Sequence, residues 1–255
     1  MINKLKTFLW YFKQPGGAGL VKNLLLQKTL YRKKENTTVE SVNWCSERAV
    51  STNEAIQKIT GKPAVSNDVR STFPAEFNYA DKMIKETAFA MGGAGNMQLL
   101  YDFCEITQAV KVVETGVAYG WSSLAILLSL NKRLGSKLVS TDMPYAKMGN
   151  DNFVGIVVPK ELKANWVLIQ EADTSAIPKA LKILDTADLI HYDSDKSYVG
   201  RMYCYPILYK LLRKGGLFIS DDIQDNVGFR DFCKQINKDP VIIAFENKYI
   251  GLFVK

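Results

Sequence analysis

The sequence has 255 residues, of which 47% are hydrophobic and 23% are charged. This length and balance are typical of one large globular domain, or of one domain with an extension, and they exclude a disordered chain, a collagen and a coiled coil. The formal net charge of +7 is unevenly distributed, because residues 1–34 hold eight basic residues and no acidic one. The remaining 221 residues hold 25 basic and 26 acidic residues, so a nearly neutral body follows a cationic N-terminal arm.

The N-terminal arm, residues 1–34, contains two apolar segments separated by a break. A helix over 2–13 would place its apolar side chains on one face and its lysines outside that face. Pro15-Gly16-Gly17 breaks the chain before the second segment. Two interpretations follow. The helices pack on the body and leave their lysines in solvent, or the arm lies against an anionic membrane, a partner or the second subunit of a homodimer.

Targeting signals and cysteines favour a reducing compartment. No stretch reaches the roughly 18 apolar residues that span a bilayer, and no cleavage site follows the short apolar run that begins at Phe8. The four cysteines form no C-x-x-C pair, so we expect free thiols in a cytoplasmic protein, with peripheral membrane contact as the alternative for the arm. The one histidine, His191, lies in an apolar run and is interpreted as a strand residue.

Residues 35–94 are predicted to be a helical and loop-rich extension. Ser51-x-x-Glu54 is a capping box, and the helix that it starts should close at Gly61. A second helix is expected over 77–90, followed by a glycine-rich break and a helix from about 96 to 108. We expect the extension to cap the substrate site.

From residue 110 the pattern changes to short apolar runs that alternate with helical segments. Such runs are typical of a parallel sheet covered by helices on both faces, and the last two runs predict an antiparallel hairpin. Residues 95–255 are therefore predicted to be an α/β, Rossmann-like, doubly wound domain with a mainly parallel seven-stranded sheet. The strands are expected at Val110–Glu114, Lys137–Asp142, Trp166–Gln170, Leu189–Tyr192, Gly216–Ser220, Val241–Glu246 and Tyr249–Val254, and the helices at about 121–133, 152–162, 174–185, 197–213 and 226–237.

Ligands of such open sheets bind beyond the carboxyl ends of the strands. The first strand ends at Glu114, and Gly116 and Gly120 follow, where backbone can approach a ligand and a helix N-terminus favours an anionic group. A tight turn without a ligand would use the same glycines. The second strand ends in Asp142, which can accept both hydroxyls of a ribose, and the third leads to Asp173, which could meet an adenine amine or cap the next helix. This combination predicts a nucleoside-containing cofactor.

Three further carboxylates are predicted to converge beside this pocket. Asp193 follows the fourth strand, and Asp221 and Asp222 follow the fifth. Such groups repel one another unless a cation neutralises them, and their oxygens suit magnesium, calcium or manganese. Lys196 would either form a salt bridge with the cluster or, with its pKa lowered by burial, take a proton from a substrate hydroxyl.

These residues resemble the class I S-adenosylmethionine-dependent methyltransferases over about residues 95–255. Asp193-Ser194-Asp195-Lys196 is similar to the small cation-dependent O-methyltransferases of the caffeoyl-CoA and catechol type, and to bacterial enzymes that methylate sugars in glycosides. The resemblance implies O-methylation of a small molecule or glycan, with S-adenosylmethionine as donor and a divalent cation such as Mg²⁺. It is carried by Glu114 to Ser123, Asp142, Asp193 to Lys196, Leu212 to Gly216, and Asp221-Asp222, although those families have asparagine in place of Asp222.

The resemblance also implies roles for individual residues. Lys196 and Asp193 would be the catalytic pair, and Asp193, Asp221 and Asp222 would bind the metal. Asn96 and Gln98 resemble the segment that closes over the cofactor. The expected cofactor-binding residues are Glu114, Gly116, Ala118, Tyr119, Gly120, Ser122, Ser123, Asp142, Met143, Asp173, Asp193, Asn96 and Gln98.

Two other functions are weighed against this one. An NAD(P)-dependent oxidoreductase would need G-x-G-x-x-G at the first turn, whereas this turn has Glu114 and a wider glycine spacing. A non-catalytic module would hold a nucleoside while the arm binds a membrane or nucleic acid. The body lacks the interleaved aromatic and basic residues of RNA-binding surfaces, which argues against nucleic acid as a partner.

Overall fold

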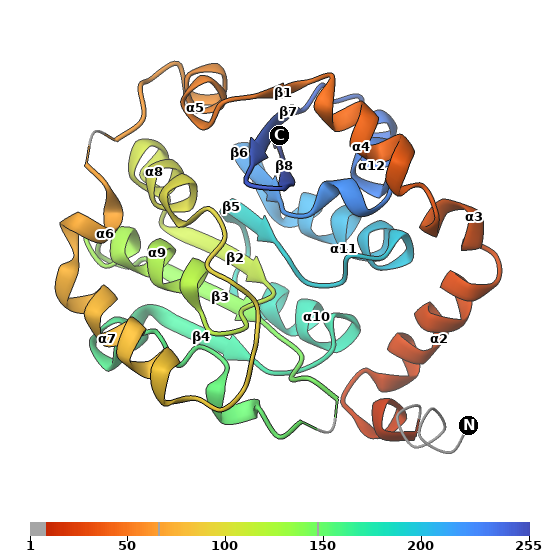
Figure 1. The fold of residues 1–255 in the computed structure, drawn as a ribbon, viewed down its shortest axis with the longest axis horizontal. Helices are drawn as coiled ribbons and strands as arrows, with labels where there is room; N and C mark the ends of the chain where they lie inside the picture. Colours follow the sequence, from red (N-terminus) through yellow and green to blue (C-terminus); the bar gives the residue numbers. More distant parts are fainter. Residues whose placement is uncertain (1–8, 66, 147) are drawn as a thin grey trace.

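The computed structural model describes residues 9–65, 67–146 and 148–255 of the chain. Their strands form an eight-stranded sheet in the order β1-β7-β8-β6-β5-β2-β3-β4 (Figure 1). β8 is antiparallel to both of its neighbours, and the other neighbouring strands are parallel. The strands are β1 (Ala49–Val50), β2 (Lys111–Thr115), β3 (Lys137–Thr141), β4 (Trp166–Ile169), β5 (Ala187–Tyr192), β6 (Leu212–Ser220), β7 (Val241–Phe245) and β8 (Lys248–Val254).

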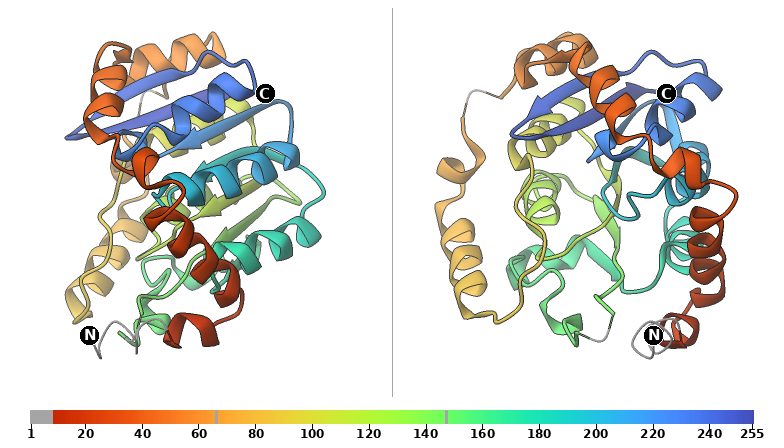
Figure 2. Two further views of the ribbon diagram at one scale, coloured as in Figure 1. Left: turned by 90° about the vertical axis from the view of Figure 1, so that its right-hand side faces the viewer. Right: turned by 45° about the vertical axis from the view of Figure 1, so that its right-hand side comes forward.

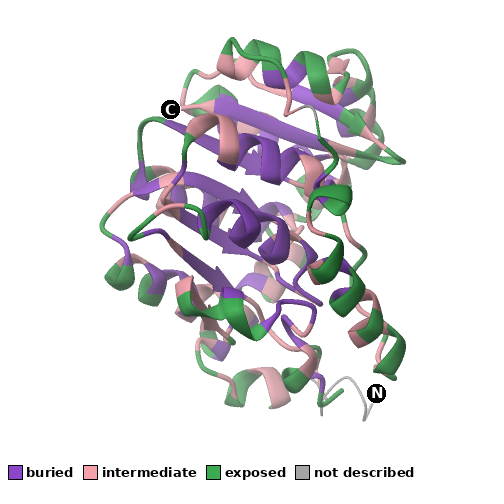
Figure 3. Ribbon diagram, turned by 90° about the vertical axis from the view of Figure 1, so that its left-hand side faces the viewer, coloured by how far each residue is buried: buried purple, intermediate pink, exposed green. Residues whose placement is uncertain are grey.

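Successive residues of the strands pack into two core layers, one on each face of the sheet. Val112 of β2 belongs to the layer that contains α8 (Met97–Thr107) and α9 (Trp121–Leu130), and Val113 belongs to the layer on the opposite face. The opposite layer contains α10 (Asp173–Ile183), α11 (Tyr198–Leu211) and α12 (Gly228–Gln235) (Figure 2). The central strands and α9 are buried throughout most of their length (Figure 3). Burial on both faces explains why the strand sequences are continuously apolar, and it confirms the predicted α/β fold.

The N-terminal arm packs against the body along its second half. Residues 9–13 are helical, and α2 (Gly17–Lys28), α3 (Arg32–Glu35) and α4 (Thr38–Ser46) follow along one side of the molecule (Figure 1). α2 contacts α10 and α11, and the contact is close because a Cβ on Gly19 would lie 2.9 Å from Thr174 Cβ. Residues 1–8 lie outside the described residues, and so does the first half of the helix predicted over 2–13. None of the described helices is both long and apolar enough to cross a bilayer.

The extension contains the helices that the sequence predicted. The Ser51 hydroxyl caps α5 (Thr52–Thr60) by accepting a hydrogen bond from Glu54 N at 3.3 Å, and Gly61 ends the helix in a left-handed conformation. α6 (Val69–Thr72) and α7 (Pro74–Glu86) follow, and a stretch without regular structure then leads to α8.

Two short elements differ from the prediction. β1 comes from the extension and pairs with β7, so the sheet has one strand more than the seven expected. The helix predicted over 152–162 is replaced by two 3₁₀ turns, η1 (Asp151–Phe153) and η2 (Lys160–Asn165). Gly155 lies between them with φ of 71°, and Pro159 directly precedes η2, so a left-handed residue and a proline interrupt the helix.

Candidate active site

Four strand ends lie side by side at one edge of the sheet. Thr115 at the end of β2 pairs with Thr141 of β3 on one side and with Tyr192 of β5 on the other, and Tyr192 pairs with Ser220 of β6. The backbone hydrogen bonds continue for one residue beyond these ends. The residues brought together in this way are Gly116, Asp142, Asp193 and Asp221.

A cavity of about 750 Å³ opens at this edge, a volume within the range of small-molecule sites. The loop 92–96 of the chain and two residues of α2, Leu20 and Asn23, complete its wall. Most of the residues predicted from the sequence line this cavity, and these are Asn96, Gly116, Ala118, Ser122, Asp142, Met143, Asp173, Asp193, Lys196, Asp221 and Asp222.

Glu114 and Ser123, predicted to bind the cofactor, lie beneath the cavity and do not line it. Glu114 is fully buried, and its Oε2 accepts hydrogen bonds from Ser123 Oγ at 2.5 Å and from Ser140 Oγ at 2.7 Å. This carboxylate therefore ties β2 to α9 and β3. Gly120 is also outside the lining, and its φ of 96° forms the turn that starts α9.

Tyr119 and Gln98 also lie outside the lining and hold segments of the extension. The Tyr119 hydroxyl donates to the carbonyl of Phe89 and accepts from Met91 N at 3.2 Å. The Gln98 carbonyl accepts from Val69 N at 2.7 Å. Both side chains fasten the extension to the domain rather than facing the cavity.

Gly116 is required by the packing of two loops. Its φ is 80°, and a Cβ at this position would lie 2.4 Å from the carbonyl oxygen of Asp193. The sequence predicts a close approach here, and the structure shows that the approaching group is the backbone of the β5–α11 loop. The glycine thus sets the separation between the first loop and Asp193.

Asp142 and Asp173 stabilise the loops on the cofactor side of the cavity. Asp142 Oδ1 accepts hydrogen bonds from Val117 N at 2.9 Å and from Ala118 N at 3.4 Å, and burial raises the pKa of this carboxyl despite those bonds. Asp173 accepts from Ser194 Oγ at 2.6 Å, and burial raises its pKa to about 6. Asp173 is the first residue of α10 and not its cap.

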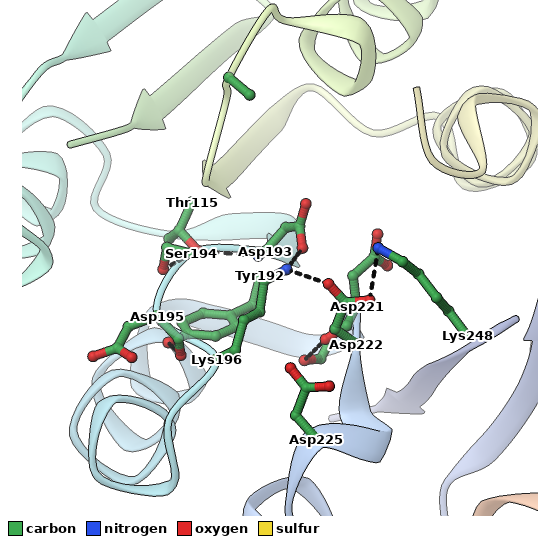
Figure 4. A network of polar contacts seen from close by, with 12 residues as sticks. Thr115, Tyr192, Asp193, Ser194, Asp195, Lys196, Asp221, Asp222, Asp225 and Lys248 are labelled. Carbon is green, nitrogen blue, oxygen red and sulfur yellow. Dashed lines mark hydrogen bonds and ion pairs between the residues drawn. The ribbon is translucent and has the colours of Figure 1, made fainter. Parts of the chain in front are cut away.

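The carboxylates beyond β5 and β6 are joined by lysines. Lys196 Nζ forms ion pairs with Asp193 Oδ1 and, at 2.7 Å, with Asp222 Oδ2 (Figure 4). Lys248, from the start of β8, reaches Asp222 Oδ1 at 3.0 Å. Buried Arg201 donates to the backbone carbonyl of Asp222 at 2.6 Å. Lys196 therefore bridges the ends of two adjacent strands.

The charges around Lys196 argue against the prediction that it takes a proton from the substrate. Burial alone would lower the pKa of Lys196, but the carboxylates of Asp193 and Asp222 outweigh burial and raise it. Burial and the negative charge of Asp221 raise the pKa of Asp193 to about 6, because together they outweigh the attraction of Lys196. The lysine is therefore a permanent cation at neutral pH, and Asp193 is the group whose proton can be exchanged there.

The donor set does not fit the predicted divalent cation. Among the described residues, no group of three or more His, Cys, Asp or Glu side chains is arranged so that it could hold a metal ion. Asp193 and Asp222 are already paired with Lys196, and Lys248 also pairs with Asp222, so two ammonium groups balance the two carboxylates. The salt-bridged alternative considered from the sequence is the one that this structure adopts.

His191 was interpreted as a strand residue, and it also lines the cavity. Its Nδ1 lies 3.6 Å from Glu114 Oε1 and its Nε2 lies 3.7 Å from Asp221 Oδ2. These distances are ion-pair contacts and too long for hydrogen bonds. Burial would lower the pKa of the imidazole, but the two carboxylates outweigh it and raise the pKa from 6.5 to about 10.

We expect the raised pKa of His191 to make stability depend on alkaline pH. A group whose pKa is higher in the folded state stabilises fully below its unfolded value, here 6.5, and loses that contribution as pH rises through about 10. The free energy of unfolding should therefore fall between about pH 7 and 10, and His191→Gln should flatten that fall. Urea unfolding of both proteins across this range measures the difference, and parallel pH profiles would refute the charged imidazole.

Several residues that line the cavity were not predicted from the sequence, among them Lys248 and two residues of α2. Lys248 was placed in the hairpin turn, but only the position of β8 beside β6 brings it to Asp222. Leu20 and Asn23 belong to the arm, which was not predicted to reach the site. No local motif marks these residues, since they enter the cavity through contacts between distant segments.

Comparison with known proteins agrees with this geometry. Residues 113–223 match the family model described as a methyltransferase domain. An O-methyltransferase of Bacillus cereus in complex with SAH is similar in structure, with a TM-score of 0.51 and 16% identity over 83% of this chain and 100% of that one. An O-methyltransferase of Klebsiella pneumoniae, described as putative in its own structure, gives 0.53 and 14% identity over 83% and 99%. An SAH-bound methyltransferase of Podospora anserina gives 0.54 and 11% over 84% and 93%. No curated protein matches the sequence.

These matches identify the class of protein. At such low identity the solved structures show a shared fold, and the family model shows what kind of domain has that fold here. Residues 113–223 therefore contain a methyltransferase domain, and the chain is a transferase. The resemblance predicted from the strand-end motifs is thereby confirmed.

Proposed function

We propose that this protein transfers the methyl group of S-adenosylmethionine to a hydroxyl oxygen of a small molecule or a glycan. One observation carries the proposal: the Asp193–Lys196–Asp222 cluster lies in the same cavity as Gly116 and Asp142, which form the loops expected to hold the nucleoside. Two of the structurally similar enzymes contain SAH, and one of these is an O-methyltransferase, which supports both the donor and the oxygen acceptor.

S-adenosylmethionine supplies an already activated methyl group, so the chain has to position donor and acceptor and to remove one proton. Asp142 stiffens the loop at Val117 and Ala118. Gly116 allows that loop to pass close to Asp193. The acceptor hydroxyl would then lie between the cofactor loops and the acidic cluster, where Asp193 is within reach of its proton.

Asp193 and Lys196 would divide the acid–base chemistry between them. Asp193 accepts the hydroxyl proton, because its pKa of about 6 leaves it ionised yet basic near neutral pH. The Lys196 ammonium stabilises the negative charge that develops on the acceptor oxygen. The pairs that Lys196 makes with Asp193 and Asp222 hold the ammonium at the junction of the two loops.

The extension would select the acceptor. Residues 92–94 of the extension line the cavity beside Asn96, which caps α8 by accepting a hydrogen bond from Leu99 N at 3.0 Å. Tyr119 and Gln98 fasten the extension to the domain at two points. These contacts support a division into an arm (1–34), a substrate cap (35–94) and a methyltransferase domain (95–255).

Calorimetry followed by an acceptor screen tests the proposal. S-adenosylmethionine should bind to the purified chain, whereas NAD and NADP should not. Incubation with labelled S-adenosylmethionine and a panel of phenols, sugars and glycosides should transfer label to a hydroxyl oxygen, which mass spectrometry can locate. Binding without transfer to any acceptor would favour the nucleoside-binding module, and transfer to nitrogen or sulfur alone would exclude O-methylation.

We expect the rate of methyl transfer to rise with pH through about 6. Above that value Asp193 is ionised and can accept the proton, and below it the carboxyl is protonated. Initial rates of SAH formation between about pH 5 and 8 measure this rise. Asp193→Asn should lose both the rise with pH and most of the turnover. If Asp193→Asn kept the same rise, a group other than Asp193 would be responsible for it.

A further inference from the structure

The arm presents apolar side chains to solvent along one side of the molecule. Leu9 is 51% exposed, Phe12 58%, Leu25 55% and Leu30 73%. All four lie between residues 9 and 30, which run as one band past α10 and α11 (Figures 1 and 2). Large apolar residues gathered on one surface segment mark an interaction site more often than scattered ones do.

The helix α2 buries one stripe of side chains against the body and exposes another. Its inner face is fixed to the body, since Val21 is buried and Leu20 and Asn23 line the cavity. Its outer face, at helical spacing, carries Lys22 and Leu25, both exposed, with exposed Lys28 one turn further on. Packing on the body therefore accounts only for the apolar residues of the inner face. The outer face, with its lysines and Leu25, has no partner within the described residues.

The charges of the arm complement an anionic surface. Residues 1–34 contain no acid, and the first acidic residue, Glu35, turns inward to accept hydrogen bonds from Tyr198 N and Val199 N. Lys34 pairs with Asp231 of the body. Within the described part of the chain, the remaining cations of the arm have no acidic partner, and these are Lys13, Lys22, Lys28, Arg32 and Lys33.

We propose that the outer face of the arm, residues 9–33, docks on the surface of an anionic lipid bilayer. Apolar side chains that enter the acyl boundary, interleaved with lysines that meet lipid phosphates, are the pattern of an interfacial helix. A second copy of the arm would bring like charges together, and a nucleic acid would leave the exposed leucines and phenylalanine without a partner. Both fit this face less well.

Docking in this way would bring the cavity close to the lipid. Leu20 and Asn23 line the cavity from the inner face of the helix whose outer face meets the bilayer. Both sets of side chains belong to one helix, whose diameter is roughly 10 Å. The protein would therefore work with its cavity beside the membrane surface, and acceptors carried by that surface would be within its reach.

Sedimentation with vesicles tests the proposal on the full chain. We expect binding to vesicles of phosphatidylcholine and phosphatidylglycerol in equal parts, weaker binding at high salt, and little binding to phosphatidylcholine alone. The variant Phe12→Ser/Leu25→Ser/Leu30→Ser should weaken binding at least about tenfold. Lys22→Glu/Lys28→Glu should do the same, because each basic residue near an anionic surface contributes about a factor of five to ten.

Matched controls use residues outside the arm. Leu134 is fully exposed, and Lys62 and Lys160 are exposed cations elsewhere, so Leu134→Ser and Lys62→Glu/Lys160→Glu should bind vesicles as the unaltered chain does. Melting temperatures within a few degrees would show that every variant is folded. Equal loss in the controls, equal binding to neutral vesicles, or no binding by the unaltered chain would overturn the proposal. So would a dimer in solution that the arm variants dissociate.

Discussion

Replacing Gly116 by alanine is expected to weaken S-adenosylmethionine binding and to slow methyl transfer by about 100-fold or more, because it displaces the first cofactor loop by about an ångström. A Cβ at residue 116 would lie 2.4 Å from the carbonyl oxygen of Asp193 and 2.6 Å from its carbonyl carbon. Both atoms belong to backbone, so neither can rotate away. The β2 loop and the β5–α11 loop would have to separate, and the cavity lies at their junction.

A matched glycine isolates the effect of the contact. Gly135 also has a positive φ, 73°, but a Cβ there would meet nothing within 4 Å. Gly135→Ala therefore carries the backbone strain without the collision, and it should bind S-adenosylmethionine normally after a loss of about 1 kcal/mol in stability. Calorimetry on both folded variants makes the comparison. Normal binding by Gly116→Ala would mean that this loop does not contact the cofactor.

Replacing Lys196 by methionine is expected to reduce the rate of methyl transfer by about 10²–10³-fold, the usual loss when one group that stabilises a developing oxyanion is removed. Binding of S-adenosylmethionine should change little, because Asp142 and the first loop are untouched. The pKa of Asp193 should rise further, since burial and Asp221 would no longer be opposed by the ammonium. The acidic limb of the rate profile should move to higher pH accordingly.

Two companion variants separate a charge role from a base role. Lys196→Arg keeps the positive charge but cannot lose a proton in the working pH range, so partial activity in this variant would support a cation, and complete loss would favour a base. Lys248→Met removes the second lysine that pairs with Asp222. The Lys248 side chain is more exposed than that of Lys196. We expect only a small effect from it. A large loss in Lys248→Met would show that the whole cluster, not Lys196, carries the effect.

Much of the cofactor side of the site could be predicted because it is encoded locally. The run from Glu114 to Gly120, with Asp142 after the next strand, specifies a strand, a glycine turn and an acidic strand end. The structure brings Gly116, Asp142, Asp193 and Asp221 to neighbouring points because parallel strands in register end at one edge. Pattern and topology therefore agree at these positions.

The acceptor side could be predicted only in part, since its chemistry depends on neighbours from distant segments. The register of β2 and β5, which sequence alone does not give, places Glu114 beside His191, and Ser123 and Ser140 hold the carboxylate below the cavity. The sequence leaves open whether Lys196 is a base with a lowered pKa or a salt-bridged cation, and its pKa rises because Asp193 and Asp222 lie on either side of the ammonium. Sequence spacing does not reveal that balance.

The amino-acid sequence by itself determined the α/β fold, the places along the chain of the strands that carry the site, the nucleoside motif and the segregation of positive charge into residues 1–34. Each of these depends on local composition or periodicity. Only the tertiary structure decided that lysines neutralise the acidic cluster, that α2 reaches the cavity, and that the arm keeps an exposed outer face. The physical reason is that charge state and exposure are set by which groups fold against one another, and those groups lie far apart in the chain.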